Sequence, residues 1–284
     1  MREALRLPNE APGEALDEAQ AKACCADLYQ SDLARLILGE TLHPGGLALT
    51  NRLGRLMGIQ RDDWVVDLAS GRGVSAMAVS RAFHCRVAGV EFSRAATVGA
   101  AAASQATSVA PQAFFLQGDA ENPPLASSRF DAVLCECSMS IFPDKSRAVQ
   151  EMRRLLRPGG RLGLSDVTVE PGYLPEELEG NLGQVLCLSG ALSVNGYRQL
   201  LRDGGLELQH QEDASVEILK LLEQLESKLG MVMAWGDRPG SGIPVSGMPD
   251  TEALQSAPEL LQRLKSLVQE GKLGYWLFVA CNQA

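Results

Sequence analysis

Three acidic residues stand where short apolar runs of the chain end. Asp67 precedes a small glycine-bearing turn, Glu91 closes the next apolar run, and Asp119 follows the third. Carboxylates at such positions accept hydrogen bonds from the hydroxyl and amino groups of a ligand. The spacing of the acids and the turn predicts a nucleotide-containing ligand at one edge of a parallel sheet.

The turn after Asp67 reads Leu-Ala-Ser-Gly-Arg-Gly, which leaves two kinds of cofactor open. A dinucleotide site requires G-x-G-x-x-G in front of a helix, but Ala76 replaces its third glycine. The S-adenosylmethionine pattern D-x-G-x-G-x-G matches Gly71 and Gly73, but Ala69 replaces its first glycine. The turn alone therefore does not choose between the two cofactors.

The elements that must position these residues alternate between strand and helix patterns. Apolar runs bounded by turn residues predict strands, and apolar positions three or four apart predict helices. The sequence predicts a mobile loop at 239–249, where Gly, Pro and Ser are frequent. The expected strands are 64–68, 86–90, 113–116, 130–134, 161–166 and 273–280, and the expected helices are 21–38, 47–57, 151–160, 193–203, 217–229 and 257–270.

Over residues 50–210 the order of motifs resembles the class I S-adenosylmethionine-dependent methyltransferases. The matching features are the acid-to-glycine loop, the acid after the second strand, Gly-Asp-Ala at 118–120, and Leu-Leu-Arg-Pro-Gly-Gly-Arg-Leu at 155–162. The resemblance implies an α/β, Rossmann-like seven-stranded sheet, mostly parallel with an antiparallel last strand. It implies an N-terminal arm and helical cap (1–58), a methyltransferase core (59–213), and a C-terminal insertion with helices, a loop and the final strand (214–284).

The same resemblance assigns residues to the cofactor. The loop from Asp67 to Gly73 would lie against its methionine part. Glu91 would bind the ribose hydroxyls and Phe92 the adenine, while Asp119 would accept from the adenine amine. Asp67 could instead cap the next helix, and Asp119 could instead form a turn. The full cofactor set is Asp67, Ala69, Ser70, Gly71, Gly73, Glu91, Phe92, Asp119, Ala120 and Cys135.

Five of the seven cysteines fall where a methyltransferase holds its substrate. Cys24 and Cys25 are adjacent near the N-terminus, Cys135 and Cys137 follow the fourth strand, and Cys187 follows the fifth. Thiolates suit a soft, thiophilic centre such as trivalent arsenic. Cys85 and Cys281 fall beside or within strands and are expected to be core residues.

The cysteine pattern resembles the arsenite methyltransferases. The matches are the Cys24-Cys25 pair, Cys137 six residues before Pro-Asp-Lys, and Cys187 opening Cys-x-x-Gly-Ala-Leu. The resemblance implies that Cys137 and Cys187 hold arsenic(III) as substrate and that Cys24 or Cys25 closes the site. It also implies a thiol reductant such as thioredoxin or glutathione.

Two other functions remain open. The chain could methylate a small organic acceptor, such as a quinone or another metabolite. An oxygen or nitrogen acceptor would need a base, for which His43 and Glu136 are the candidates. The chain could also be a non-catalytic S-adenosylmethionine-binding or thiol-sensing protein.

Composition limits the partners and the compartment. The chain has 284 residues, 45% of them hydrophobic, which suffices for a large α/β core. A net charge of −9 argues against nucleic acid, which requires clustered Lys and Arg. We expect no membrane span, because no stretch approaches about 20 apolar residues. The N-terminus lacks an apolar signal core, so we expect a cytoplasmic protein with reduced cysteines.

Overall fold

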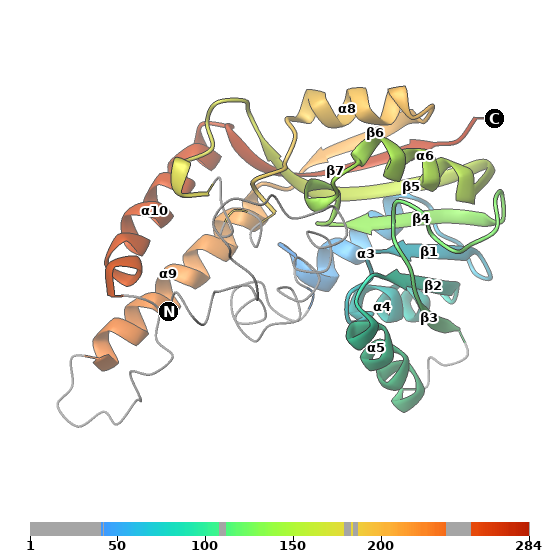
Figure 1. Cartoon of the computed structure of the whole chain (residues 1–284), viewed down its shortest axis with the longest axis horizontal. Coiled ribbons are helices and arrows are strands. Elements are labelled where there is room, and N and C mark those ends of the chain that lie inside the picture. The colour runs from blue at the N-terminus through green and yellow to red at the C-terminus, as the bar shows by residue number, and fades with distance from the viewer. Residues whose placement is uncertain are drawn as a thin grey trace, which may run out of the picture.

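The computed structural model describes residues 41, 43–107, 112–178, 183, 187–236 and 251–283. Its strands are β1 (Trp64–Leu68), β2 (Arg86–Glu91), β3 (Ala113–Gln117), β4 (Phe130–Glu136), β5 (Leu156–Val169), β6 (Glu207–Asp213) and β7 (Leu273–Cys281). They form one sheet in the order β3-β2-β1-β4-β5-β7-β6 (Figure 1). β1 to β5 pair in parallel, and β7 is antiparallel to both of its neighbours. The predicted fold class is confirmed.

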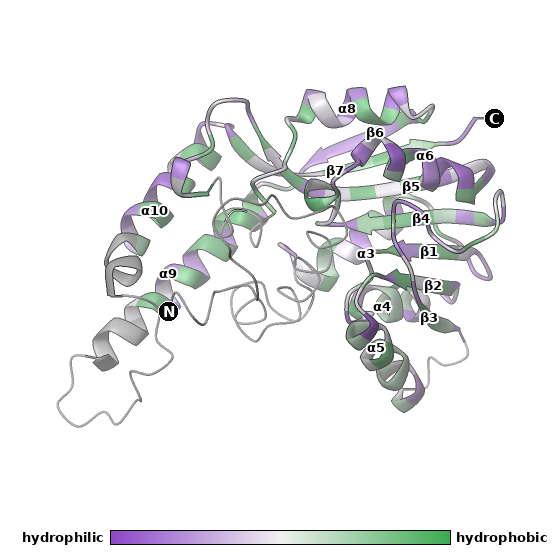
Figure 2. Cartoon of the chain, in the orientation of Figure 1, coloured by the Kyte–Doolittle hydropathy of each residue, from purple (hydrophilic) through white to green (hydrophobic). Residues whose placement is uncertain are grey.

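Two elements differ from the sequence predictions. α6 (Lys145–Leu155) is capped by the side chain of Asp144 and ends at Leu155, whereas the sequence predicted, within 151–160, a helix that Pro158 and the glycines end. Residues 156–160 instead begin β5, where Leu156 pairs with Phe130. β6 was missed because Glu-Leu-Gln-His-Gln-Glu-Asp has no apolar run, as befits an edge strand whose residues are largely exposed. Figure 2 shows its hydrophilic colour.

Helices cover both faces of the sheet. α3 (Gly46–Leu56), α4 (Val74–Phe83) and α5 (Arg94–Ala106) pack on one face, and α6 and α8 (Val194–Asp203) on the other. The predicted helices at 47–57 and 193–203 correspond to α3 and α8. Each face buries a separate apolar cluster, so the central strands are apolar on both sides.

The alternation of side chains along β1 and β4 decides which residues face α3 and α4. In β1, Val65 belongs to the cluster under these helices and Val66 to the opposite one. In β4, Leu134 and Cys135 divide in the same way. Because side chains alternate along a strand, Asp67 lies on the α3–α4 side.

The C-terminal part of the chain both completes the sheet and extends from it. β7 lies between β5 and β6, as a final antiparallel strand. α9 (Val216–Gly236) and α10 (Thr251–Gln269) pack against each other and project away from the sheet (Figure 1). They correspond to the helices predicted at 217–229 and 257–270. The predicted helix at 21–38 and the loop at 239–249 lie outside the described residues.

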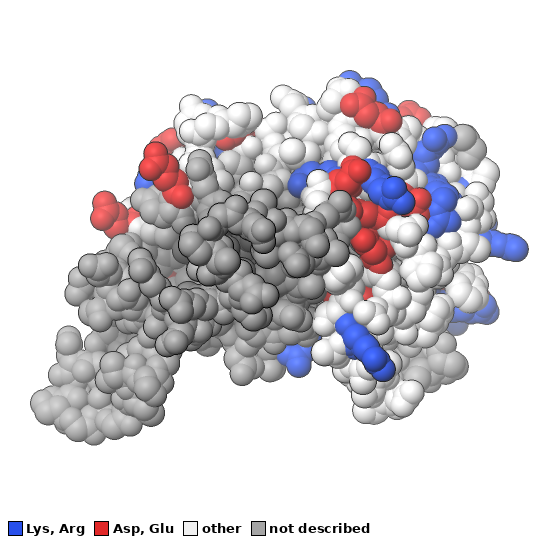
Figure 3. Space-filling view, in the orientation of Figure 1, with Lys and Arg blue, Asp and Glu red and all other residues white. Residues whose placement is uncertain are grey.

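The described surface mixes charges of both signs. On the face in Figure 3, Lys and Arg side chains lie beside Asp and Glu side chains and uncharged residues. Among the described helices, none is long and apolar enough to cross a membrane.

Gly163 of β5 lets α3 approach the sheet. A Cβ at this position would lie 2.2 Å from the Sδ atom of buried Met57, which directly follows α3. We expect Gly163→Val to lower the free energy of unfolding by about 1–3 kcal/mol through overpacking, measured by denaturant unfolding. Gly99→Ala is the control, because Gly99 is exposed on α5 and an added Cβ meets nothing within 4 Å. It should raise stability by about 0.5–1 kcal/mol. An unchanged Gly163→Val protein would contradict this packing.

Candidate active site

The loop between β1 and α4 is built on left-handed backbone. Ala69, Gly71 and Gly73 have φ angles of 57°, 52° and 75°. A Cβ at Gly73 would lie 2.4 Å from the Phe115 ring, so packing requires glycine there. A Cβ at Gly71 would meet nothing within 4 Å, which leaves open space beside the backbone for a ligand. Ala69 adopts a conformation that favours glycine, which explains why glycine is the usual residue in this pattern.

Asp67 is buried, and one of its carboxylate oxygens has no hydrogen-bond partner. The backbone N–H of Ala76, in the first turn of α4, lowers the pKa of the group slightly. Burial raises the pKa of Asp67 well above its usual range, and the nearby Glu136 and Glu91 raise it further. Asp67 therefore lies near the first turn of α4, whose N-cap residue is Gly73. It also presents an unpartnered oxygen to which a positively charged ligand group would bind favourably.

Glu91, at the end of β2, forms hydrogen bonds with the loop after β1 and with the start of the segment before α5. One of its oxygens accepts from the N–H of Gly71 and the other from the N–H of Ser93, both at 2.8 Å. Burial raises the pKa of this carboxyl group. Each oxygen keeps a second lone pair with which it can accept a ligand hydroxyl. Phe92, half-buried, follows directly, and its carbonyl accepts from the Gln117 side chain at 3.2 Å.

Asp119 and Ala120 follow β3. The carboxylate of Asp119 accepts from the N–H of Glu121 at 2.9 Å, so this side chain forms the turn that the sequence left open. Ala120 is buried. The structure thus places the acids at 67, 91 and 119 at the carboxyl ends of three adjacent parallel strands, where open α/β sheets bind ligands.

A second group of polar side chains borders this edge. His43, which precedes α3, lies beside Thr50 of α3, Ser75 of α4 and Glu136 at the end of β4. The His43 Nε2 atom is 3.6 Å from Glu136 Oε2, and both side chains are almost fully buried. Thr50 Oγ1 donates toward both carboxylate oxygens, each at 3.1 Å. The two base candidates from the sequence therefore lie together.

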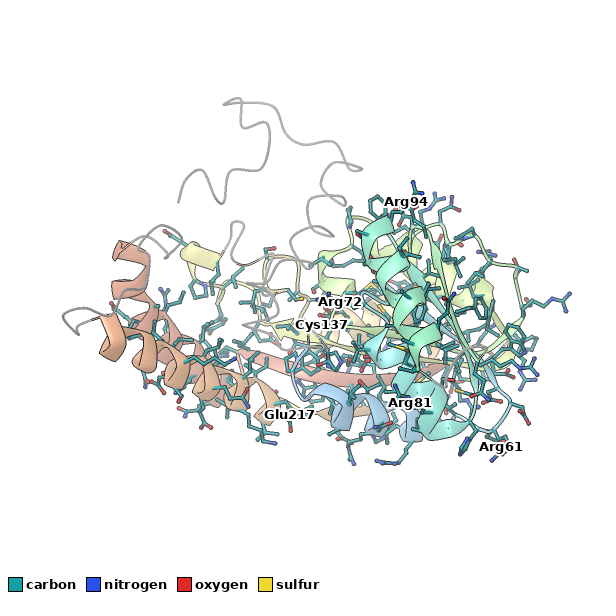
Figure 4. The ribbon with its side chains drawn as sticks, turned by 90° about the horizontal axis from the view of Figure 1, so that it is seen from below. Arg61, Arg72, Arg81, Arg94, Cys137 and Glu217 are labelled. Carbon is teal, nitrogen blue, oxygen red and sulfur yellow. The ribbon has the colours of Figure 1, made fainter. Side chains whose placement is uncertain are left out.

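Cys137 and Cys187 form a buried pair. Their sulfur atoms are 3.3 Å apart, and the Cys187 thiol also lies 3.3 Å from the Cys137 carbonyl oxygen. The hydrogen bond with Cys187 and burial raise the pKa of the Cys137 thiol well above its usual range. Cys137 follows β4, and Arg61 precedes β1, so the two lie at opposite ends of the sheet (Figure 4).

The other cysteines are separate from this pair. Cys135 lies in the apolar cluster under α6 and α8, where burial raises the pKa of its thiol. Cys85 is buried as expected, whereas Cys281 is half-buried at the end of β7. Cys24 and Cys25 lie outside the described residues. Within the described ranges, no three His, Cys, Asp or Glu side chains are grouped to hold a metal ion.

Two buried polar groups near the Cys137–Cys187 pair had no functional role in the sequence predictions. Asp166 of β5 accepts from the Ser140 N–H at 3.0 Å, and burial raises its pKa to about 6. Ser165 and Tyr275 hydrogen-bond across β5 and β7 at 3.1 Å. The sequence predicted a strand over 161–166, so the signal that singled out Asp67 could also have found Asp166, although β5 continues to Val169.

Comparisons with known proteins agree with this arrangement. A family model described as a methyltransferase domain matches residues 65–160. The 27-O-demethylrifamycin SV methyltransferase of Amycolatopsis mediterranei is 28% identical over 88% of this chain and 93% of its own length. An arsenite methyltransferase of Halobacterium salinarum is 29% identical, over 50% of this chain and 37% of its own.

The fold also matches a solved structure. Phosphoethanolamine N-methyltransferase 2 of Haemonchus contortus, with bound S-adenosyl-L-methionine, superposes with a TM-score of 0.73 at 14% identity. The match covers 93% of this chain and 60% of that one. The buried acids fit such a cofactor, because its sulfonium and ammonium groups are positive and its ribose carries hydroxyls. The sheet order with its antiparallel β7 is that of the class I S-adenosylmethionine-dependent methyltransferase fold, and residues 65–160 match a methyltransferase domain.

Proposed function

We propose that the chain transfers a methyl group to a small organic acceptor bound at the carboxyl edge of the sheet. The observation that carries this proposal is the extent of the match to the rifamycin-type enzyme, which spans nearly the whole of both chains. A relative that shares the segments flanking the core shares the parts that shape an acceptor site. The arsenite-type relative matches only half of this chain.

The cofactor would lie along the ends of β1, β2 and β3. The loop at 67–73 would hold its methionine part, with Asp67 facing a positive group and Gly71 giving close backbone approach. Glu91 would accept from the ribose hydroxyls beside Phe92, and Asp119 with Ala120 would bind the adenine. The cofactor supplies a methyl group on a sulfonium, ready for in-line displacement. The protein would then contribute mainly the orientation of acceptor and donor.

Arsenic(III) is a second candidate acceptor, favoured by the Cys137–Cys187 pair. Two sulfur atoms 3.3 Å apart are placed to bind one thiophilic atom between them. Hydrogen bonding and burial raise the pKa of the Cys137 thiol, which favours its protonated form. Each thiol that binds arsenite would lose its proton to the water released from an arsenite hydroxyl. A third thiol would have to come from Cys24 or Cys25.

Asp67→Asn tests the cofactor site. The substitution keeps the shape of the side chain and removes its charge. We expect the affinity for S-adenosylmethionine to fall at least about tenfold, corresponding to about 1.4 kcal/mol, in isothermal titration. The free variant should be no less stable than the wild type, because a buried carboxylate is removed. Asp203→Asn, at an exposed position on α8, is the control. If Asp67→Asn binds S-adenosylmethionine as tightly as the wild type, then Asp67 does not face a positive group of the cofactor.

Methyl transfer should be measured on a panel of phenols, alcohols and amines, with arsenite as a separate arm. The assay follows S-adenosylhomocysteine formation by the reduced protein. We expect turnover with at least one organic acceptor and weak or absent turnover with arsenite. Turnover with arsenite alone would contradict the proposal and favour the second candidate.

Substitution of the paired cysteines separates the two candidates. We expect Cys137→Ser and Cys187→Ser to keep S-adenosylmethionine affinity and organic-acceptor turnover within about threefold of the wild type, because neither cysteine belongs to the residues assigned to the cofactor. The half-buried Cys281→Ser is the matched control. If instead the reduced wild type binds arsenite tightly and only the two pair variants lose both binding and methyl transfer, arsenic is the acceptor.

A further inference from the structure

We propose that His43 and Glu136 together accept the proton that the acceptor loses, so that the methylated group is an O–H or N–H. This inference rests on the proposed function and narrows its substrate class. The two side chains belong to a buried polar cluster with Thr50 and Ser75, here called the His43 cluster. The cluster joins the segment before α3, α3 itself, the start of α4 and the end of β4.

The hydrogen bonds of the imidazole fix which nitrogen can take a proton. The Nδ1 atom lies 3.0 Å from the carbonyl oxygen of Pro44, which can only accept. Nδ1 must therefore carry the hydrogen, and in the neutral ring the lone pair is on Nε2. That nitrogen faces the hydroxyl of Ser75 at 3.4 Å and the carboxylate of Glu136.

Both Nε2 of His43 and the Glu136 carboxylate have hydrogen-bond donors in the cluster, so neither needs a proton shared between the two side chains. The Thr50 hydroxyl can donate to Glu136, and the Ser75 hydroxyl can donate to Nε2 of His43. Two bare acceptors 3.6 Å apart in a buried site would otherwise repel each other. The two hydroxyls thus stabilise the unprotonated state, which is the state that a proton acceptor must occupy before the reaction.

The position of Glu136 connects the cluster to the cofactor loop. Glu136 ends β4, which pairs with β1, and its charge raises the pKa of Asp67. Glu136 therefore borders the acids assigned to the cofactor. A proton acceptor at this edge lies where the acceptor must meet the methyl group.

The reaction then conserves the charge of the site. The acceptor's oxygen or nitrogen forms a bond to the methyl carbon, while the carbon–sulfur bond breaks and its electron pair stays on sulfur. The acceptor's proton passes to His43 Nε2, and the new imidazolium pairs with Glu136. The positive charge lost from the sulfonium reappears beside a carboxylate, so the buried acids keep a cationic partner.

The chain contains a matched control pair on its surface. His210 Nε2 lies 3.7 Å from Glu212 Oε2, nearly the same separation, but His210 is 45% exposed. This pair lies on the edge strand β6. His210→Gln therefore removes the same chemistry from a position outside the site.

The first arm of the test needs no acceptor. Nitrogen NMR of the full-length free protein should show the neutral His43 ring protonated at Nδ1, the less common tautomer of free histidine. The chain has only three histidines, so His43→Gln and His210→Gln assign the signals. A neutral ring protonated at Nε2 would overturn the proposal, because its lone pair would then face Pro44.

The second arm uses the organic acceptor found in the panel. We expect His43→Gln to lower kcat by about 10²–10⁴-fold, with the KM of the acceptor and the cofactor affinity changed less than about threefold. Glu136→Gln should also lower kcat, since the imidazolium loses its counter-charge. His210→Gln should match the wild type. Turnover by His43→Gln equal to wild type overturns the inference alone, whereas a wild type inactive on every organic acceptor overturns the proposed function.

Discussion

The burial of three carboxyl groups at one edge of the sheet is the constraint on which the site depends. Asp67, Glu91 and Glu136 lie at the carboxyl ends of β1, β2 and β4 with their side chains removed from water. Such a group is costly unless each charge is hydrogen-bonded or neutralised. Loop N–H groups satisfy Glu91 and hydroxyl and imidazole groups surround Glu136, but one oxygen of Asp67 is left without a partner. A cationic cofactor would supply the positive partner that Asp67 lacks at this edge of the sheet.

The backbone of the loop after β1 provides a hydrogen-bond donor for Glu91, one of these buried carboxyl groups. Left-handed residues at 69, 71 and 73 turn the chain sharply after β1, so that the Gly71 N–H points to Glu91 and the ligand side stays open. Gly163 lets α3 lie close to β5, and α3 carries Thr50 to Glu136. Fold packing and site chemistry are therefore joined through the same helix.

The sequence predicted the parts of the site that are local in the chain. Asp67, Glu91 and Asp119 each end or follow an apolar run, and parallel pairing brings such ends to one edge. The contact between Thr50 and Glu136 joins residues 86 positions apart, and no periodicity reports it. The Cys137–Cys187 contact was expected only through a family resemblance. β6 was not predicted because an exposed edge strand needs no apolar face. The predicted end of α6 was wrong because Pro158 and its glycines lie within β5, after the helix has already ended.

If the buried carboxyl groups are neutralised by the positive charge of the cofactor, then binding of the cofactor must release protons. Burial raises the pKa of Asp67 and of Glu91, so the free site holds more protons than the same groups in water. A bound cation lowers those pKa values and expels protons. Titration calorimetry with S-adenosylmethionine, in buffers of different ionisation enthalpy near neutral pH, counts them. We expect S-adenosylmethionine to release protons on binding, and S-adenosylhomocysteine, whose sulfur is uncharged, to release fewer. Binding without release, or with uptake, would contradict this expectation.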